Sequence, residues 1–518
     1  MKETTRRTGS SSPRTKTRNG RVEDARVPPR LNRVARWIGI SFILTIGTLL
    51  VFAALDVRLG QGYFAYRYSP LRGARTMRAA AALPVMLLAA GSVWALVMRK
   101  RWGPLTLAAA LIAGTLWVWW APPAQIRQHA FNLRSVSSDG AFVLEAEFTP
   151  NMTEYLRHFD RRLARTPAEM MGTRVLSNPP GTTALAYAVI HAFPTQVDPP
   201  GALERYLLRT TDVEPEGLAI IVNSLHTAMA LLLLWSLAAV VAYFLGRLYL
   251  SPAGAAFFAI VATWNPSTVH FVPGKDPAQL LTINLMLLCW LGGWKRRSML
   301  LSTLAGSLLV VGVTIGLIHI WVALAVFAAT AWEARAERSI KLLLQNALAA
   351  AVGALVVLLL ALQAMGWNIA GQTLAVAQRF SELQETFNMS RAVWFVIGLP
   401  IFLLFLPLGF WALAGLRVDR RRLGFGGRIA VCTLAVMLVT YLMGVTYELP
   451  RLWVAFLPPL TLGLAIDLPM LRSATPSRRV ARFLAATVAI HVVATALHWT
   501  IFDVREAEYR LITQRLYN

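Results

Sequence analysis

Charged residues beside long apolar segments are the side chains of this sequence that could carry chemistry. Asp139 stands in the polar stretch Ser138-Asp139-Gly140-Ala141-Phe142, beyond an apolar segment that ends at Ala121. A carboxylate held at the rim of a membrane can serve as a general base. The alternative interpretation is a helix that begins near Ser138, with the serine or the aspartate as its N-cap.

A second carboxylate, Asp276, follows the turn sequence Val272-Pro273-Gly274 and the cation Lys275. It could bind a metal ion or a substrate. The same sequence fits an acidic first helical turn that complements the helix dipole. His270 could add a metal ligand or a proton carrier, although a lone histidine at an interface is usually only hydrogen-bonded.

The sequence Tyr447-Glu448-Leu449-Pro450-Arg451 brings a cation to the start of a late apolar segment. An arginine at the mouth of a membrane span could clamp the phosphate of a lipid. An arginine that only snorkels to the interface is the alternative. His319 separates two short apolar halves and could cap the turn of their hairpin.

Membrane helices must position these residues. The chain of 518 residues is 56% hydrophobic and only 15% charged, whereas soluble proteins carry about 25% charged residues. Apolar segments recur at the length that transmembrane helices require, and they are too continuous for barrel strands. We expect an all-α polytopic membrane protein with about thirteen transmembrane helices. The expected spans are 37–56, 79–98, 104–121, 217–246, 252–268, 277–294, 298–314, 317–333, 341–366, 392–415, 426–445, 450–470 and 481–502.

The formal net charge of +25 would suggest nucleic acid in a soluble protein, but a basic patch alone is weak evidence. Lys and Arg gather in residues 1–36 and in short connections between apolar segments, as the positive-inside rule describes. If the thirteen spans alternate, these clusters all fall on one side, so the N-terminus is cytoplasmic and the C-terminus lies outside. The alternation requires the apolar stretch 181–193 to lie along the membrane without crossing it. We expect the lipid bilayer as a partner and no nucleic acid.

The expected organisation has four parts. Residues 1–36 form a disordered basic cytoplasmic tail and 37–103 an additional N-terminal transmembrane hairpin. Residues 104–470 form the main transmembrane module, with an outer loop at 122–216, and 471–518 form the final helix and a short outer tail. Further outer loops are expected at 58–78 and 368–391. The sequence has no Walker loop and no zinc-protease helix, so ATP-driven transport and zinc proteolysis have no support.

The chain resembles the superfamily C glycosyltransferases (the GT-C fold), which include the protein O-mannosyltransferase and aminoarabinose transferase families. Their first outer loop carries an acidic pair, an aromatic residue and a further acid, and Asp139, Phe142 and Glu147 follow that pattern. The end of the loop, Asn178-Pro179-Pro180-Gly181, resembles the His-Pro-Pro of the family. Glu448 and Arg451 resemble its late motif, in which an acid and an arginine stand at the mouth of a span.

Two positions depart from the family pattern. Gly140 stands where the second acid of the pair is usual, and Asn178 stands in place of the histidine. The first departure weakens the case for a two-carboxylate metal site in this loop, and the second removes one ligand or phosphate contact.

The resemblance implies that a sugar moves, with inversion, from a polyprenyl-phosphate donor to a hydroxyl of a cell-envelope glycan, lipid or protein. The reaction would take place at the outer face of the plasma membrane. Asp139 would be the catalytic base, and Asp276 could hold a divalent cation, magnesium or manganese. The remaining implied roles are donor-phosphate binding by Arg451, Lys275 and Asn178, and support of the site by Glu147, Glu448, His270 and His319.

Two other classes of function stay open from the sequence. A transporter or flippase for a lipid-linked or small solute should place ionisable residues near mid-membrane, whereas the candidates here lie at the outer rim. A degenerate, non-catalytic assembly factor would fit Gly140 and Asn178. For the enzymatic interpretation, Asp139, Asp276 and Arg451 should meet in one outward cavity that opens sideways to lipid.

Overall fold

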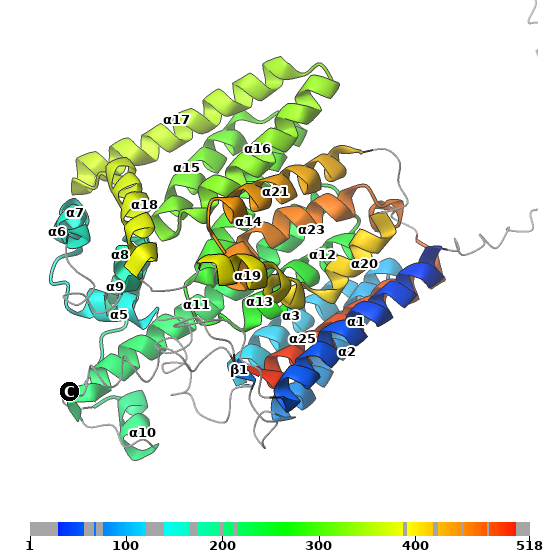
Figure 1. Ribbon diagram of the computed structural model, residues 1–518, viewed down its shortest axis with the longest axis horizontal. Coiled ribbons are helices and arrows are strands. Elements are labelled where there is room, and N and C mark those ends of the chain that lie inside the picture. The colour runs from blue at the N-terminus through cyan, green and yellow to red at the C-terminus, as the bar shows by residue number, and fades with distance from the viewer. Residues whose placement is uncertain are drawn as a thin grey trace, which may run out of the picture.

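Helices make up nearly all of the part of the chain that the structure describes. The computed structural model describes residues 30–55, 67–68, 76–120, 139–164, 173–196, 200–210, 215–386, 391–417, 423–446, 449–473 and 476–503. In Figure 1 the long helices run beside one another, and the short helices α5 to α9 gather at one end of the bundle together with α18.

Eight helices within the described residues are long and apolar enough to cross a membrane, or nine if one bent pair counts as a single span. The broad prediction of an all-α polytopic membrane protein is therefore confirmed, while the number of thirteen spans stays a prediction. The eight are α1 (Arg30–Ala54), α2 (Thr76–Val97), α11 (Pro215–Arg247), α14 (Asp276–Arg296), α17 (Ile340–Met365), α21 (Phe425–Leu442), the segment α22–η3–α23 (Leu449–Leu452, Trp453–Phe456 and Leu457–Ile466) and α25 (Arg478–Ile501). Shorter or less apolar helices are α3 (Gly103–Trp120), α12 (Pro252–Thr263), α13 (Pro266–Val269), α15 (Met299–Ile315), α16 (Ile318–Ala336) and α24 (Pro469–Arg472).

The predicted span 392–415 is bent in the middle. The chain forms α19 (Arg391–Phe405) and α20 (Leu408–Arg417), which are bent by 93° relative to each other. The break falls at Pro407. Proline has no backbone N–H to donate, and its ring clashes with the preceding helical turn. That proline is the signal in the sequence that predicts the bend.

The predicted outer loop 368–391 contains a helix over most of its length, α18 (Ile369–Thr386). Ile369, Gln372 and Val376 are buried at helical spacing along one face. Gln372 accepts a hydrogen bond from Trp367 Nε1 (2.9 Å) and donates to the carbonyl of Leu156 (2.6 Å). This buried face ties α18 to the short helices.

The N-terminal tail is shorter than expected, because α1 begins at Arg30 and so includes residues 30–36. Residues 1–29 lie outside the described part of the chain. The first turns of α1 combine buried Leu31 and Val34 with exposed polar residues, which explains why this basic stretch is helical.

Six short helices lie in the described parts of the predicted outer loop 122–216. One of them, α9, has twelve residues, and a helix of that length extends only about 18 Å against a hydrocarbon core of about 30 Å. α9 is therefore too short to cross, as the alternation of spans requires. The six are α5 (Gly140–Glu147), α6 (Met152–Arg157), α7 (Phe159–Leu163), α8 (Thr173–Leu176), α9 (Gly181–Ala192) and α10 (Ala202–Thr210).

A short strand pairing joins the segment between α1 and α2 to the end of α25. Strand β1 (Arg67–Tyr68), from the predicted outer loop 58–78, pairs antiparallel with β2 (Phe502–Asp503). α25 packs along α2 and also contacts α1, and Trp499 of α25 meets Trp117 of α3 edge to face (5.5 Å between ring centroids). The connection after α1 and the end of α25 therefore lie at the same end of the bundle.

Two glycines set the distance between α15 and α17. A Cβ on Gly306 would lie 1.8 Å from the carbonyl oxygen of Ala350, and one on Gly353 would lie 1.9 Å from that of Thr303. Small residues at such contacts let the backbones of membrane helices approach closely. Neither position has room for a methyl group unless the helices move apart.

We expect Gly306→Ala to destabilise the protein by about 1–3 kcal/mol, because the added methyl overpacks the α15–α17 contact. The measurement is the thermal unfolding midpoint of the purified protein in detergent. The control is Gly91→Ala in α2, where an added Cβ meets no atom within 4 Å and the midpoint should stay equal or rise. Equal losses in the two variants would contradict the tight contact.

Candidate functional site

One buried arginine joins two of the predicted carboxylates. Arg451 Nη2 donates to Asp139 Oδ1 (2.9 Å) and Oδ2 (2.8 Å), and its Nε donates to Asp276 Oδ2 (2.8 Å). We call Asp139, Lys275, Asp276 and Arg451 the Arg451 cluster. The three residues expected to meet are in direct contact, although Asp139 and Arg451 are 312 positions apart in the chain.

The Arg451 cluster is buried, which differs from the open cavity expected from the sequence. Its four residues are at most 5% exposed, and Arg451 is only 1% exposed. Two carboxylates and two cations give the cluster a formal charge of zero. Since an unpaired buried charge is costly, each side chain depends on the others for its placement.

Asp139 occupies the N-cap position of α5 but makes no side-chain capping bond there. The capping interpretation is therefore wrong for this residue. Its carboxylate turns instead toward the start of α14, where Oδ2 accepts the backbone N–H of Lys275 (2.5 Å). A helix N-terminus carries a partial positive charge, so α14 and Arg451 both stabilise the ionised form of Asp139.

The helix α5 that carries Asp139 is firmly packed. Phe142 is buried against Tyr155 and Phe159, and Glu145 pairs with Arg162 (3.2 Å). Burial, followed by the nearby Glu145, raises the pKa of Tyr155 well above its usual range, so this phenol stays neutral. These contacts fix the position of Asp139 without using it as a cap.

Lys275 links the cluster to the end of the outer loop. Its Nζ donates to Asn178 Oδ1 and to the carbonyl of Ile315 (3.4 Å). Asn178 directly precedes the Pro179-Pro180 entry into α9 and is buried. The structure therefore brings Asn178 to the cluster, through Lys275.

Gln279 belongs to the same network, and the sequence analysis missed it. With its amide oriented to suit its neighbours, Nε2 donates to Asp276 Oδ1 (3.2 Å) and Oε1 accepts from Lys275 Nζ (3.2 Å). Gln279 lies three and four positions after these residues on α14, the spacing at which helix side chains meet. That spacing is the signal that could have found it.

Three of the expected supporting residues make other contacts. Glu147, at the far end of α5, accepts from Asn223 Nδ2 of α11 (3.0 Å). His270 Nε2 lies 2.8 Å from His498 Nδ1 of α25. His319 contacts the Thr282 hydroxyl and the Gly316 carbonyl (both 2.7 Å), so it closes the α15–α16 turn as proposed. Glu448 lies outside the described residues.

The residues of the cluster, as arranged, do not fit the divalent cation expected at Asp276. Both oxygens of Asp139 accept from Arg451, and those of Asp276 accept from Arg451 and Gln279. The described residues contain no group of three or more His, Cys, Asp or Glu side chains that could hold a metal. Arg451 and Lys275 already neutralise the two carboxylates, so the mechanism below uses no metal.

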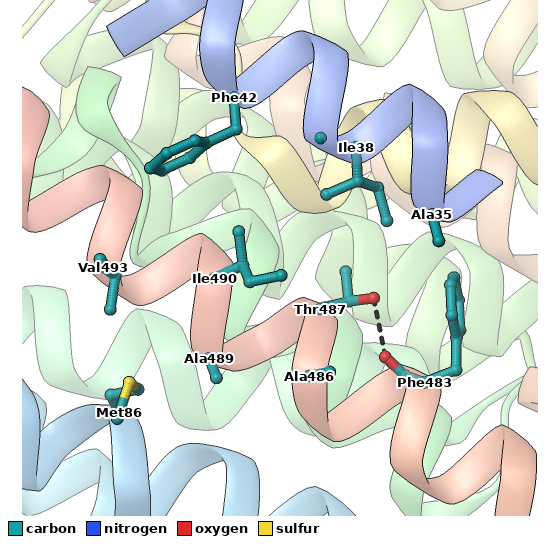
Figure 2. Close-up of a pocket in the computed structure, with 11 residues that line it drawn as sticks. Ala35, Ile38, Phe42, Met86, Phe483, Ala486, Thr487, Ala489, Ile490 and Val493 are labelled. Atoms are coloured by element: carbon teal, nitrogen blue, oxygen red, sulfur yellow. Dashed lines mark hydrogen bonds between the residues drawn. The ribbon is translucent and has the colours of Figure 1, made fainter. Parts of the chain in front are cut away.

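The cavity in Figure 2 lies between α1 and α25, next to α2, and has a volume of about 420 Å³. Its lining is apolar except for Thr487, whose hydroxyl donates to the carbonyl of Phe483 (2.8 Å). Ligand sites need a few polar groups that fix the orientation of the ligand. This cavity offers none free, so the Arg451 cluster is the better candidate site.

No protein-family model matches this chain, and no curated protein does. The chemistry of the site therefore rests on the residues of the Arg451 cluster and on their geometry.

We expect Arg451→Met to lower the free energy of unfolding by about 3–5 kcal/mol, because it leaves two buried carboxylates without their partner. The measurement is chemical unfolding in detergent. The control is Arg157→Met, which breaks a pair with Glu154 whose side chains are 49% and 55% exposed and should cost at most about 1 kcal/mol. Similar small losses in both variants would show that the cluster is not a closed charge network.

Proposed function

We propose that this protein is an integral membrane glycosyltransferase that moves a sugar from a polyprenyl-phosphate donor to an acceptor hydroxyl, with inversion. The observation that carries the proposal is the Arg451 cluster. It joins a carboxylate that can accept a proton with two cations that can bind a phosphate. The resemblance to the superfamily C glycosyltransferases supports the same assignment.

The proposed reaction needs a negatively charged group at the acceptor and positively charged groups at the leaving phosphate. The acceptor oxygen bonds to C1 of the sugar as the bond from C1 to the phosphate oxygen breaks, and the electron pair of that bond stays on the phosphate. Asp139 takes the proton of the acceptor hydroxyl. Arg451 and Lys275 stabilise the negative charge that develops on the leaving phosphate.

Donor binding also releases the base in this mechanism. Without donor, Arg451 holds both oxygens of Asp139. A phosphate is a strong bidentate partner for arginine, so the donor competes with Asp139 for the guanidinium. Asp139 becomes free to accept a proton only when a leaving group is in place. Asn178 holds Lys275 toward the same phosphate.

The site belongs to the outer face in this proposal. Asp276 starts α14, and Lys295 and Arg296 end it, so the cluster and the basic helix ends lie at opposite ends of the bundle. The positive-inside rule makes the basic end cytoplasmic. The protein then crosses the plasma membrane thirteen times and meets a cell-envelope glycan, lipid or protein as acceptor.

A non-catalytic role is the second candidate, and one observation favours it. Every carboxylate oxygen of the cluster accepts a hydrogen bond from within the protein, as in an ion-pair network that only holds helices together. In this case the cluster locks α5, α14 and α22 in register for an assembly factor without turnover.

We expect Asp139→Asn to lower sugar transfer by a factor on the order of 10²–10⁴, the usual contribution of a general base. The assay uses the purified protein in lipid, a set of labelled polyprenyl-phosphate sugars and envelope acceptor extract. Asparagine keeps the shape of the side chain and removes its basicity, so donor binding should persist.

The matched control is Glu145→Gln on the same helix, which removes another buried carboxylate that is paired with an arginine. Its turnover should stay close to that of the wild type. Equal turnover in Asp139→Asn and the wild type would exclude Asp139 as the base. No turnover of any donor by the wild type would favour the non-catalytic role.

A further inference from the structure

A polar cavity lies at the basic end of the bundle, about 28 Å from the Arg451 cluster along α14 by helix rise. It has a volume of about 520 Å³. The ends of α14, α16 and α23 and the starts of α17 and α21 form its walls. We call it the basic-end cavity and define it by Tyr249, Lys295, Arg297, Glu337, Ser339, Phe425 and Arg472 among its lining residues.

The charges of this cavity do not cancel. Two further carboxylates of its wall are already neutralised by arginines that do not line it: Glu333 pairs with Arg428, and Asp467 pairs with Arg417 (2.6 Å). Asp467 also accepts the backbone N–H of Gly427 at the start of α21 (2.8 Å).

Among the described residues of the wall, three cations remain, Lys295, Arg297 and Arg472, against the single carboxylate of Glu337. The Lys295 ammonium lies over the ring of Tyr249, 4.8 Å from its centroid. An excess of cations in a concave site attracts an anion.

A hydroxyl in the wall is also free to bind. Ser339 precedes α17 but its side chain does not cap that helix. Its Oγ is buried and has no hydrogen-bond partner among the described residues. An unsatisfied buried hydroxyl is costly, and an anion in the cavity would provide the missing partner.

Arg297 stands where the backbone favours glycine. It follows α14 with φ of 54°, in the left-handed region, where the Cβ of an L-residue is crowded against the following carbonyl oxygen. Arg99, in the turn between α2 and α3, has the same conformation with φ of 52°. Replacement by glycine removes the positive charge at either position and also removes the backbone strain.

We infer that the basic-end cavity binds the phosphate headgroup of an anionic lipid in the cytoplasmic leaflet. Tyr249, Trp294 and Phe425 line it, and aromatic residues concentrate at the level of lipid headgroups. Leu300, Ile340 and Leu344 at the neighbouring helix starts are 52–70% exposed, which gives the acyl chains an apolar surface. Basic pockets between membrane helices on the cytoplasmic side are known to suit lipid headgroups.

The test measures binding of dioleoylphosphatidylglycerol to the purified full chain by native mass spectrometry. Dioleoylphosphatidylcholine and soluble glycerol phosphate are the comparison probes. We expect Arg297→Gly to weaken binding of the anionic lipid about fivefold, the effect of one cation near a headgroup. Arg99→Gly makes the same backbone exchange in another basic turn and should bind as the wild type does.

Three results would overturn the inference. Wild-type affinity in Arg297→Gly would exclude the cavity as the site. An equal loss in Arg99→Gly would show only a general attraction to basic helix ends. Glycerol phosphate that binds as tightly as the lipid would assign the cavity to a soluble phosphate. Both glycine variants should fold, because glycine adopts the left-handed conformation without cost. The outcome does not depend on sugar transfer.

Discussion

A single buried guanidinium constrains this end of the molecule. Arg451 is 1% exposed and holds a carboxylate from each of two distant segments. Burial of an arginine requires partners whose geometry is nearly ideal, so α5, the start of α14 and α22 must stay in one arrangement. The packing of Phe142 beneath α5 and the contact of Lys275 with Asn178 serve this arrangement.

The same constraint makes the cluster a competition between anions. Asp139 and Asp276 share one arginine, and the N-terminus of α14 supplies a further donor to Asp139. In the proposed mechanism, the donor phosphate meets cations that are already placed and paired. Its binding free energy would have to offset the loss of the internal pairs, and the exchange would free the carboxylate of Asp139.

The sequence predicted the chemical groups of this site better than their surroundings. Asp139, Asp276 and Arg451 stand out because charges are rare in so apolar a chain, and the positive-inside pattern places them at one end. Gln279 was not predicted because a neutral amide near the start of a helix can fill many structural roles. The bend at Pro407 was missed because the long apolar stretch around it outweighed a single proline. The helix α18 was missed because its polar composition outweighed the helical spacing of its apolar residues. Asp139 and Arg451 are 312 positions apart in the chain. Their contact depends on how distant helices pack, and no local sequence pattern encodes it.

The pairing of β1 with β2 and of α2 with α25 has a consequence for how the protein is made. Val97 ends α2 and Arg478 starts α25, so the partners lie 381 positions apart (478 − 97). At about 5–20 residues per second, the ribosome needs roughly 20–80 seconds to supply the second partner. During that time the face of α2 that later packs on α25 is without this partner. The packing of α2 is therefore completed only when α25 is made, and a chain that stops before α25 leaves that face of α2 in contact with lipid.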